Sequence, residues 1–220
     1  RALLTGKEKY CLRLSEIRLD KRKAVGILQI GIPSAFQYSL FAFANLFVQS
    51  SVNSFDHVLV EGNSAAANAD PLVYDMMAAF YTACSSFIAQ NFGARKKKRI
   101  LQTYLICLFY SFITSLVLGV GIYLARYPFL YLFTSDKAVV EAGITRLSIM
   151  ALSYSASAFM DASIAASRGL GKTAVPTFVV VMGSCVFRII WIYTIFAYFH
   201  TIQSLYILYV FSWGITAIAE

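Results

Sequence analysis

The chain has 220 residues, of which 59% are hydrophobic and only 14% are charged, whereas soluble domains have about 45–50% apolar and about 25% charged residues. So many apolar residues exceed what a soluble core of this size can bury, which indicates a lipid-embedded protein and excludes intrinsic disorder. The 19 Lys and Arg residues outnumber the 11 Asp and Glu residues, giving a formal net charge of +8. Such an excess serves nucleic-acid binding, contact with anionic lipid or membrane topology, and the positions of the charges decide which.

Six apolar segments follow a basic N-terminal segment, residues 1–24. Because about 20 apolar residues cross a bilayer as a helix, we expect spans near residues 25–54, 62–92, 101–125, 142–167, 174–199 and 204–219. The segments are apolar at odd and even positions alike, unlike the alternating strands of a membrane barrel. A short loop is expected at residues 56–61. The sequence thus predicts an all-α integral membrane protein, and a fragment, since it begins with Arg1 and stops inside a short last span.

The basic residues separate to one side of this topology. Six crossings place residues 1–24, 95–99 and 168–172 on one side, with 15 of the 19 Lys and Arg residues, and leave three on the other side: Arg126, Lys137 and Arg146. The positive-inside rule makes the richer side cytoplasmic. The run RKKKR at residues 95–99 alone resembles a nucleic-acid patch, but between two spans it is expected to anchor the protein at anionic headgroups. We therefore expect a multi-pass plasma-membrane protein whose partner is the bilayer and not nucleic acid.

Charged residues inside the expected spans are the strongest functional candidates. Each costs about 2.5–3.5 kcal/mol at the bilayer centre and tends to face protein or water. The candidates are Asp70, Asp75, Asp161 and Arg188.

The second span carries a polar stripe. Asn63, Asp70, Tyr74 and Tyr81 are spaced by seven, four and seven residues, which places them on one helix face. Asp75 lies about 140° away on the same helix, so Asp70 is the better candidate for a cavity. The alternative is that Asp70 lies at headgroup level near the start of the helix.

The first span has a second polar arc, formed by Ser34, Gln37, Asn45, Gln49 and Asn53. Such side chains suit a wet pathway, and they also hold helices together by hydrogen bonds. Both readings of Asn45 and Gln49 stay open from the sequence.

Asp161 and Arg188 lie in the fourth and fifth spans. They are expected either to pair with each other or to act separately, in which case a free Asp161 can exchange a proton. Tyr74 and its neighbouring aromatic residues are expected to bind cations through their ring faces or simply to pack.

Other chemistries find little support. The four Cys residues form no CxxC pair and His57 and His200 stand alone, so no metal site is expected. A phosphate-binding loop would need glycine at Ala166. Without a nucleophile–base or metal constellation, an enzyme is not expected, and neither is a cofactor beyond a coupling ion.

Several motifs resemble one transporter family. In chain order they are GIPS at 31–34 with NLFVQS at 45–50, GNSAAANAD at 62–70 with QNFGA at 90–94, RGLGKT at 168–173, and GSCVFR at 183–188. They resemble the seventh helix, the eighth helix, the turn after the tenth and the eleventh helix of multidrug and toxic compound extrusion (MATE) transporters. Asp70 falls where bacterial relatives commonly have glutamate, and Asp161 where they commonly have an acid. Asp75 matches no family pattern, and Asp56 replaces a more usual glycine.

The resemblance implies one lobe of a two-lobed, twelve-helix antiporter. Residues 1–24 would be a cytoplasmic linker and residues 25–220 the C-terminal lobe, whose main partner is the missing N-terminal lobe. The implied activity is export of small organic cations in exchange for protons or sodium ions. The candidate substrate- and ion-binding residues are Asp70, Asp161, Tyr74, Asn45, Gln49 and Arg188. The alternatives are a flippase of lipid-linked precursors, which expects more intramembrane Arg and Lys, and a non-transporting membrane scaffold.

Overall fold

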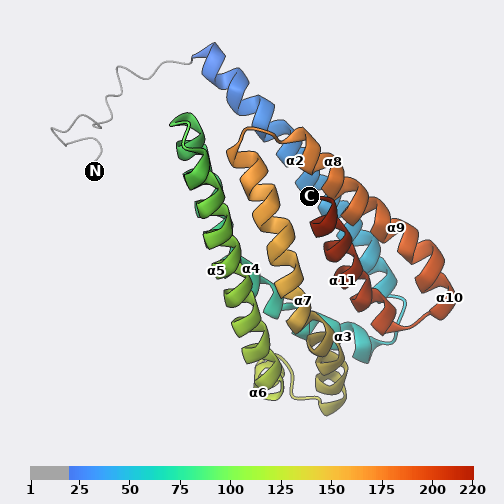
Figure 1. The fold of residues 1–220 in the computed structure, drawn as a ribbon. Coiled ribbons are helices and arrows are strands. Elements are labelled where there is room, and N and C mark those ends of the chain that lie inside the picture. Colours follow the sequence, from blue (N-terminus) through green and yellow to red (C-terminus); the bar gives the residue numbers. More distant parts are fainter. Residues whose placement is uncertain (1–19) are drawn as a thin grey trace.

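The computed structural model describes residues 20–220, and within them it contains six helical segments long and apolar enough to cross a membrane and no strand (Figure 1). The prediction of an all-α membrane fold is therefore confirmed. The spans run over Lys21–Val52, His57–Gly93, Lys97–Leu124, Lys137–Gly169, Ala174–Phe199 and Ile202–Ala219. Most of the expected linker, residues 1–19, lies outside the described residues.

Several spans are divided into shorter elements. The α-helices are α2 (Lys21–Val52), α3 (His57–Ala67), α4 (Ala69–Gly93), α5 (Lys97–Leu124), α6 (Arg126–Tyr131), α7 (Lys137–Gly169), α8 (Ala174–Val180), α9 (Phe187–Trp191), α10 (Ala197–Phe199) and α11 (Ile202–Ala219). Two π-helical turns, η2 (Val181–Val186) and η3 (Ile192–Phe196), join α8, α9 and α10.

Aspartate caps set the starts of three helices. The side chains of Asp20, Asp56 and Asp136 accept hydrogen bonds from backbone N–H groups in the first turns of α2, α3 and α7. The Asp56 carboxylate accepts from the Leu59 N–H at 3.0 Å. The expected loop at residues 56–61 is therefore wrong, because this cap lets α3 begin at His57.

The second span breaks at Asn68. Pro71 has no N–H and cannot donate to the carbonyl of residue 67, so the helix is interrupted just before it. The Asn68 side chain instead donates to the Ser64 and Ala65 carbonyls, each at 3.1 Å. The break lies beside Asp70, the acidic residue of the polar stripe.

Helix α7 is the central helix of the lobe. It packs against α3, α4, α5, α6 and α11, and 56% of its span is buried, compared with 11% for the span of α2. A Cβ at Gly119 of α5 would lie 2.0 Å from the Ala151 carbonyl oxygen of α7, so only glycine permits this close approach. As expected for small residues in membrane helices, Ala151, Ala158 and Ala162 are buried at helix contacts.

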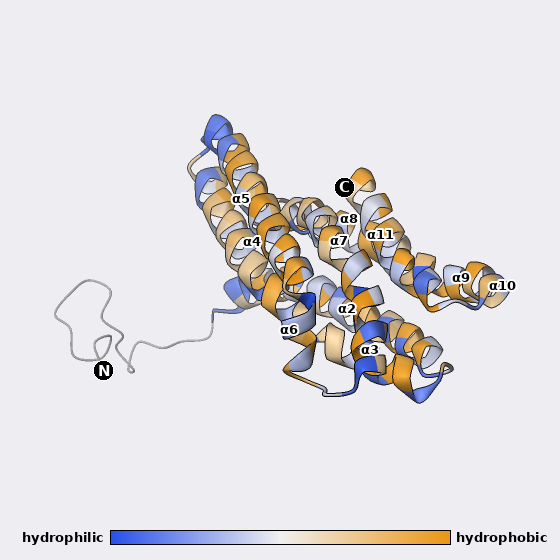
Figure 2. Ribbon diagram, turned by 90° about the horizontal axis from the view of Figure 1, so that it is seen from below, coloured by the Kyte–Doolittle hydropathy of each residue, from blue (hydrophilic) through white to orange (hydrophobic). Residues whose placement is uncertain are grey.

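Many large hydrophobic side chains are exposed, and Figure 2 shows hydrophilic residues concentrated near the helix ends. The start of α2, the α4–α5 turn and the α7–α8 turn lie at the same end of the molecule (Figure 1). This is the arrangement that the charge segregation predicts for the basic segments. Within the α7–α8 turn, Gly171 has φ +75°, a left-handed conformation that favours glycine.

Candidate functional site: a polar cavity between the helices

A cavity of about 730 Å³ opens between α2, α3, α4, α7 and the last two spans. Its walls include all six residues selected from the sequence: Asn45, Gln49, Asp70, Tyr74, Asp161 and Arg188. Asn63 and Tyr81 also line it, so the whole polar stripe of the second span faces one space. Asp75 is exposed and does not belong to the lining, which agrees with the helical-wheel argument.

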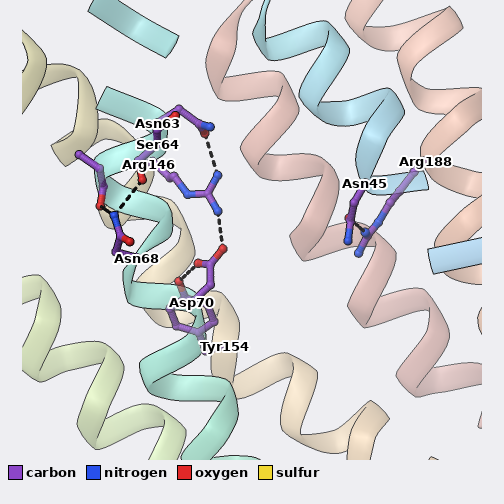
Figure 3. Close-up of polar contacts among 9 residues, drawn as sticks. Asn45, Asn63, Ser64, Asn68, Asp70, Arg146, Tyr154 and Arg188 are labelled. Atoms are coloured by element: carbon purple, nitrogen blue, oxygen red, sulfur yellow. Dashed lines mark hydrogen bonds and ion pairs between the residues drawn. The ribbon is translucent and has the colours of Figure 1, made fainter. Parts of the chain in front are cut away.

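Asp70 is bound by two side chains of α7, Arg146 and Tyr154 (Figure 3). Arg146 of α7 donates from Nη2 to Asp70 Oδ2 at 2.6 Å and from Nη1 to Asn63 Oδ1 at 2.7 Å. The Tyr154 hydroxyl donates to the other carboxylate oxygen of Asp70. Asp70 is thus the acceptor of a buried network that joins α3, α4 and α7.

Arg146 is the main residue that the sequence interpretation missed. The sequence interpretation counts it only among the charges on the side opposite the basic segments, whereas it lies in α7, is 7% exposed and lines the cavity. The available signal was its position within an apolar segment, eight residues before Tyr154 and therefore near the same helix face. From the sequence, a long charged side chain near the end of a span is expected at the membrane interface. Only the packing of α3 against α7 shows which residues Arg146 contacts.

Arg188 lies in another part of the same cavity wall, where α9 meets α2 and α11. Its Nη1 donates to Asn45 Oδ1 at 2.6 Å and its Nε donates to Ser212 Oγ at 3.2 Å. The guanidinium carbon lies 4.5 Å from the ring centres of both Phe41 and Tyr209. Figure 3 shows Arg188 beside Asn45 and apart from the network around Asp70.

Asp161 and Arg188 do not form an ion pair. Within residues 20–220, the Arg146–Asp70 contact is the ion pair among the cavity residues, and no Lys, Arg or His nitrogen lies within 4.0 Å of the Asp161 carboxylate. The structure therefore favours the second of the two expectations from the sequence, in which the two residues act separately. Asp161 lies in the cavity wall with Tyr74, Tyr81 and Met160.

Arg168 closes the end of the cavity near the basic turns. It donates to Gln37 Oε1 and to the Tyr38 hydroxyl, both at 3.3 Å, and Thr177 donates to the same Gln37 oxygen at 3.2 Å. This network connects α2, α7 and α8.

The polar arc of α2 is only partly in the cavity. Gln37, Asn45 and Gln49 line it, whereas Ser34 donates to the Ile30 carbonyl of its own helix. The Gln49 amide donates to Asn53 Oδ1 at 2.9 Å. Both expected uses of such residues therefore occur on one helix.

The charges of the cavity wall are unevenly matched. Three arginines and two aspartates line it, and one arginine–aspartate pair is made. The cavity thus holds a carboxylate and a buried guanidinium that lack ionic partners in the described part of the chain. Such groups are suited to binding charged solutes in a space of low dielectric constant.

The MatE family model matches residues 33–194 of the chain. A curated relative, described as a FAD transporter from Shewanella oneidensis strain MR-1, is 24% identical over 134 residues, which are 61% of this chain and 29% of that protein.

Among solved structures, a MOP superfamily transporter from Pyrococcus furiosus is similar with a TM-score of 0.86 and 20% identity, over 99% of this chain and 50% of the other. Its published description reports a binding pocket of reversed polarity. A MATE structure in a straight conformation gives a TM-score of 0.87 and 18% identity, over 99% of this chain and 49% of the other. The chain therefore spans about half the length of these transporters and shares the fold of one half. This multi-pass membrane chain belongs to the MatE family of transporters.

Proposed function

We propose that this chain forms the C-terminal lobe of a secondary antiporter that exports organic cations across the plasma membrane in exchange for protons or sodium ions. Its basic segments, residues 1–24, 95–99 and 168–172, would face the cytoplasm. Family membership and the half-length match support the transporter class and a single lobe, and the order of the motifs in the sequence supports the C-terminal one. Lobe, cargo and coupling ion are our proposal.

The observation that carries the proposal is the unpaired carboxylate of Asp161 in the cavity wall. Asp70 is already held by Arg146 and Tyr154, so a cation would have to displace an arginine to reach it. Asp161 has no such competitor within residues 20–220. A proton or sodium ion and an organic cation would therefore compete for Asp161, and binding of one would favour release of the other.

The cavity wall suits an amphipathic cargo. Tyr74 packs edge-on against Tyr154 and Trp213, with ring centres 5.8 and 6.1 Å apart. These rings offer apolar area and a π-face to a cationic ring system. The volume of about 730 Å³ lies in the range of drug-sized sites, about 300–1,000 Å³.

The partner is the N-terminal lobe of the same polypeptide. Asn45 and Gln49 line the cavity and are also exposed, so the cavity has an open polar side that a second lobe would cover. We expect no transport from residues 1–220 alone in proteoliposomes.

The test uses the complete polypeptide in proteoliposomes with an imposed pH or sodium gradient and a fluorescent organic cation. Asp161→Asn should abolish gradient-driven exchange, whereas Asp75→Asn, on the exposed face of α4, should retain it. Unchanged exchange in Asp161→Asn would remove this residue from the mechanism. Absence of any gradient-driven flux in the unmodified protein would favour the scaffold alternative.

One observation favours a second candidate, a flippase for lipid-linked precursors. Such a protein needs positive charge for phosphates, and three arginines line the cavity instead of the one expected. The cation exporter is preferred because Arg146 is neutralised by Asp70 and Arg168 is tied to Gln37. The test is the transfer of a fluorescent lipid diphosphate between leaflets. Transfer by the unmodified protein that is lost in Arg146→Gln, a variant in which Asp161 is unchanged, would reverse this preference.

A further inference from the structure

Arg188 has one guanidinium nitrogen without a partner. The side chain is 0% exposed, and Nη1 and Nε are occupied by Asn45 and Ser212. Nη2 is buried and makes no hydrogen bond, although the residue lines the cavity. A buried donor without an acceptor is unfavourable, so this nitrogen is a candidate for contact with an occupant of the cavity.

The charge of Arg188 is also unmatched. Within residues 20–220, no carboxylate lies within 4.0 Å of its nitrogens. Its surroundings are the rings of Phe41 and Tyr209 and two neutral oxygen acceptors. Burying a cation without an anion costs several kcal/mol in proteins, and the rings and amide offset this only in part. The surroundings of Arg188 thus provide two hydrogen-bond acceptors and two aromatic rings, but no carboxylate from the described residues.

The backbone singles out the same residue. Arg188 lies in the five-residue helix α9, which is bracketed by the π-turns η2 and η3. Such turns are rare and occur frequently at functional sites because they rotate the side chains that follow. Here they interrupt the one described span whose centre carries an unpaired arginine.

The other two arginines of the cavity are committed elsewhere. Arg146 pairs with Asp70 at 2.6 Å, and Arg168 donates to Gln37 and Tyr38. The Nη2 group of Arg188 keeps free N–H donors, and a charged guanidinium donor binds carboxylate and phosphate oxygens more strongly than a neutral donor does.

We propose that Arg188 is an anion-binding residue of the cavity, which takes a carboxylate or phosphate group from a transported compound or from a lipid headgroup. The first source rests on the proposed function and deepens it: a cargo held by Asp161 through its cationic part and by Arg188 through its anionic part is zwitterionic. Phe41 and Tyr209 would then pack beside the anionic group.

The test compares a rhodamine free acid with its methyl ester. The two dyes share one cationic ring system and differ in a single carboxylate. Binding to the complete, detergent-purified polypeptide is followed by fluorescence anisotropy. We expect the acid to bind at least about tenfold more tightly than the ester, which is the range for hydrogen bonds to charged groups. In Arg188→Gln the preference should fall to about one, with the ester affinity little changed.

A matched control is Arg126→Gln. Arg126 also contacts aromatic rings, 4.6 Å from Tyr123 and 5.3 Å from Tyr127, and donates to the Tyr123 carbonyl, but it lies outside the cavity lining. This variant should keep the preference for the acid. If Arg188→Gln does not fold, Arg188→Lys replaces it, because lysine keeps the positive charge but has a single nitrogen donor group. The acid-to-ester affinity ratio of the unmodified protein and of Arg188→Lys then decides the question.

A lipid arm separates the two sources. The dye is bound to the protein in nanodiscs of either phosphatidylglycerol or phosphatidylcholine. If phosphatidylglycerol displaces the acid dye more than phosphatidylcholine does, and only when Arg188 is present, a lipid headgroup is the anion. Displacement by neither lipid, with the acid preference intact, identifies the transported compound. Equal affinity for acid and ester in the unmodified protein, without any effect of phosphatidylglycerol, would overturn the proposal. A preference that survives Arg188→Gln would do the same.

These outcomes are independent of the exchange experiment. Binding is measured without a gradient, so loss of the acid preference in Arg188→Gln would support the anion site even if the unmodified protein showed no gradient-driven cation flux. In that case the proposed function alone would fail.

Discussion

Replacing Asp70 by Asn should destabilise the lobe, because it removes the counter-ion of a buried arginine. Arg146 is 7% exposed and would keep Asn63 as its main acceptor, at 2.7 Å. Breaking a buried ion pair from one side costs about 3–5 kcal/mol. The Asp70 side chain is 28% exposed to the cavity, so water there and the new amide oxygen would recover part of this. We expect a loss of about 2–3 kcal/mol in the free energy of unfolding.

The assay is reversible unfolding of the complete polypeptide by sodium dodecyl sulfate titrated into mixed micelles, followed by Trp fluorescence. Arg146→Met alone should cost less, because the partly exposed Asp70 carboxylate remains solvated. The double variant should be more stable than the sum of the two single changes predicts, by about 1–2 kcal/mol, because each single change leaves the other charge unmatched. Asp75→Asn, five residues along the same helix and exposed, is the control.

Two results would refute this reasoning. One is a loss in Asp70→Asn no larger than that in Asp75→Asn. The other is strict additivity of the Asp70 and Arg146 changes, which would mean that the 2.6 Å contact carries no coupling energy.

The same titration tests three further changes. Gly119→Ala places a methyl group 2.0 Å from the Ala151 carbonyl oxygen and should cost about 1–3 kcal/mol, whereas Gly121→Ala on the same helix meets no atom within 4 Å and should change stability by less than about 0.5 kcal/mol; equal effects would contradict the close packing of α5 on α7. Tyr154→Phe removes a hydroxyl that donates to the aspartate of the buried pair and should cost about 1 kcal/mol, and a neutral result would show that this bond adds nothing. Asp136→Ala removes the cap of α7, which accepts from a backbone N–H at 2.8 Å, and should cost about 1 kcal/mol unless the packing of α7 alone fixes its start.

The sequence was sufficient to predict the architecture because its signals are local. Long uncharged runs mark the spans, and the separation of basic residues predicts which way each span crosses the membrane. Helical periodicity also placed Asp70, Tyr74 and Tyr81 on one face and Asp75 on another, and the cavity lining agrees. These features depend only on the spacing of residues along one helix.

The sequence interpretation falls short at two places, one for a local reason and one for a tertiary reason. The loop expected at residues 56–61 is helical because the Asp56 side chain accepts from the Leu59 backbone N–H and so caps the helix, which composition alone does not reveal. The place of Arg146 in the cavity wall does not follow from the sequence, because its burial depends on how α3 and α7 pack.

Sequence by itself thus determined the class of protein, its six spans and the set of polar residues that enter the membrane. Only the tertiary structure decided how those residues are paired: Asp70 with Arg146, Arg188 with Asn45 and Ser212, and Asp161 with no cation among residues 20–220. The reason is that spacing fixes the angle of a side chain on its own helix, whereas pairing depends on the rotation and depth of each helix against its neighbours. Close contacts such as Gly119 on Ala151, together with the π-turns around Arg188, set those two quantities.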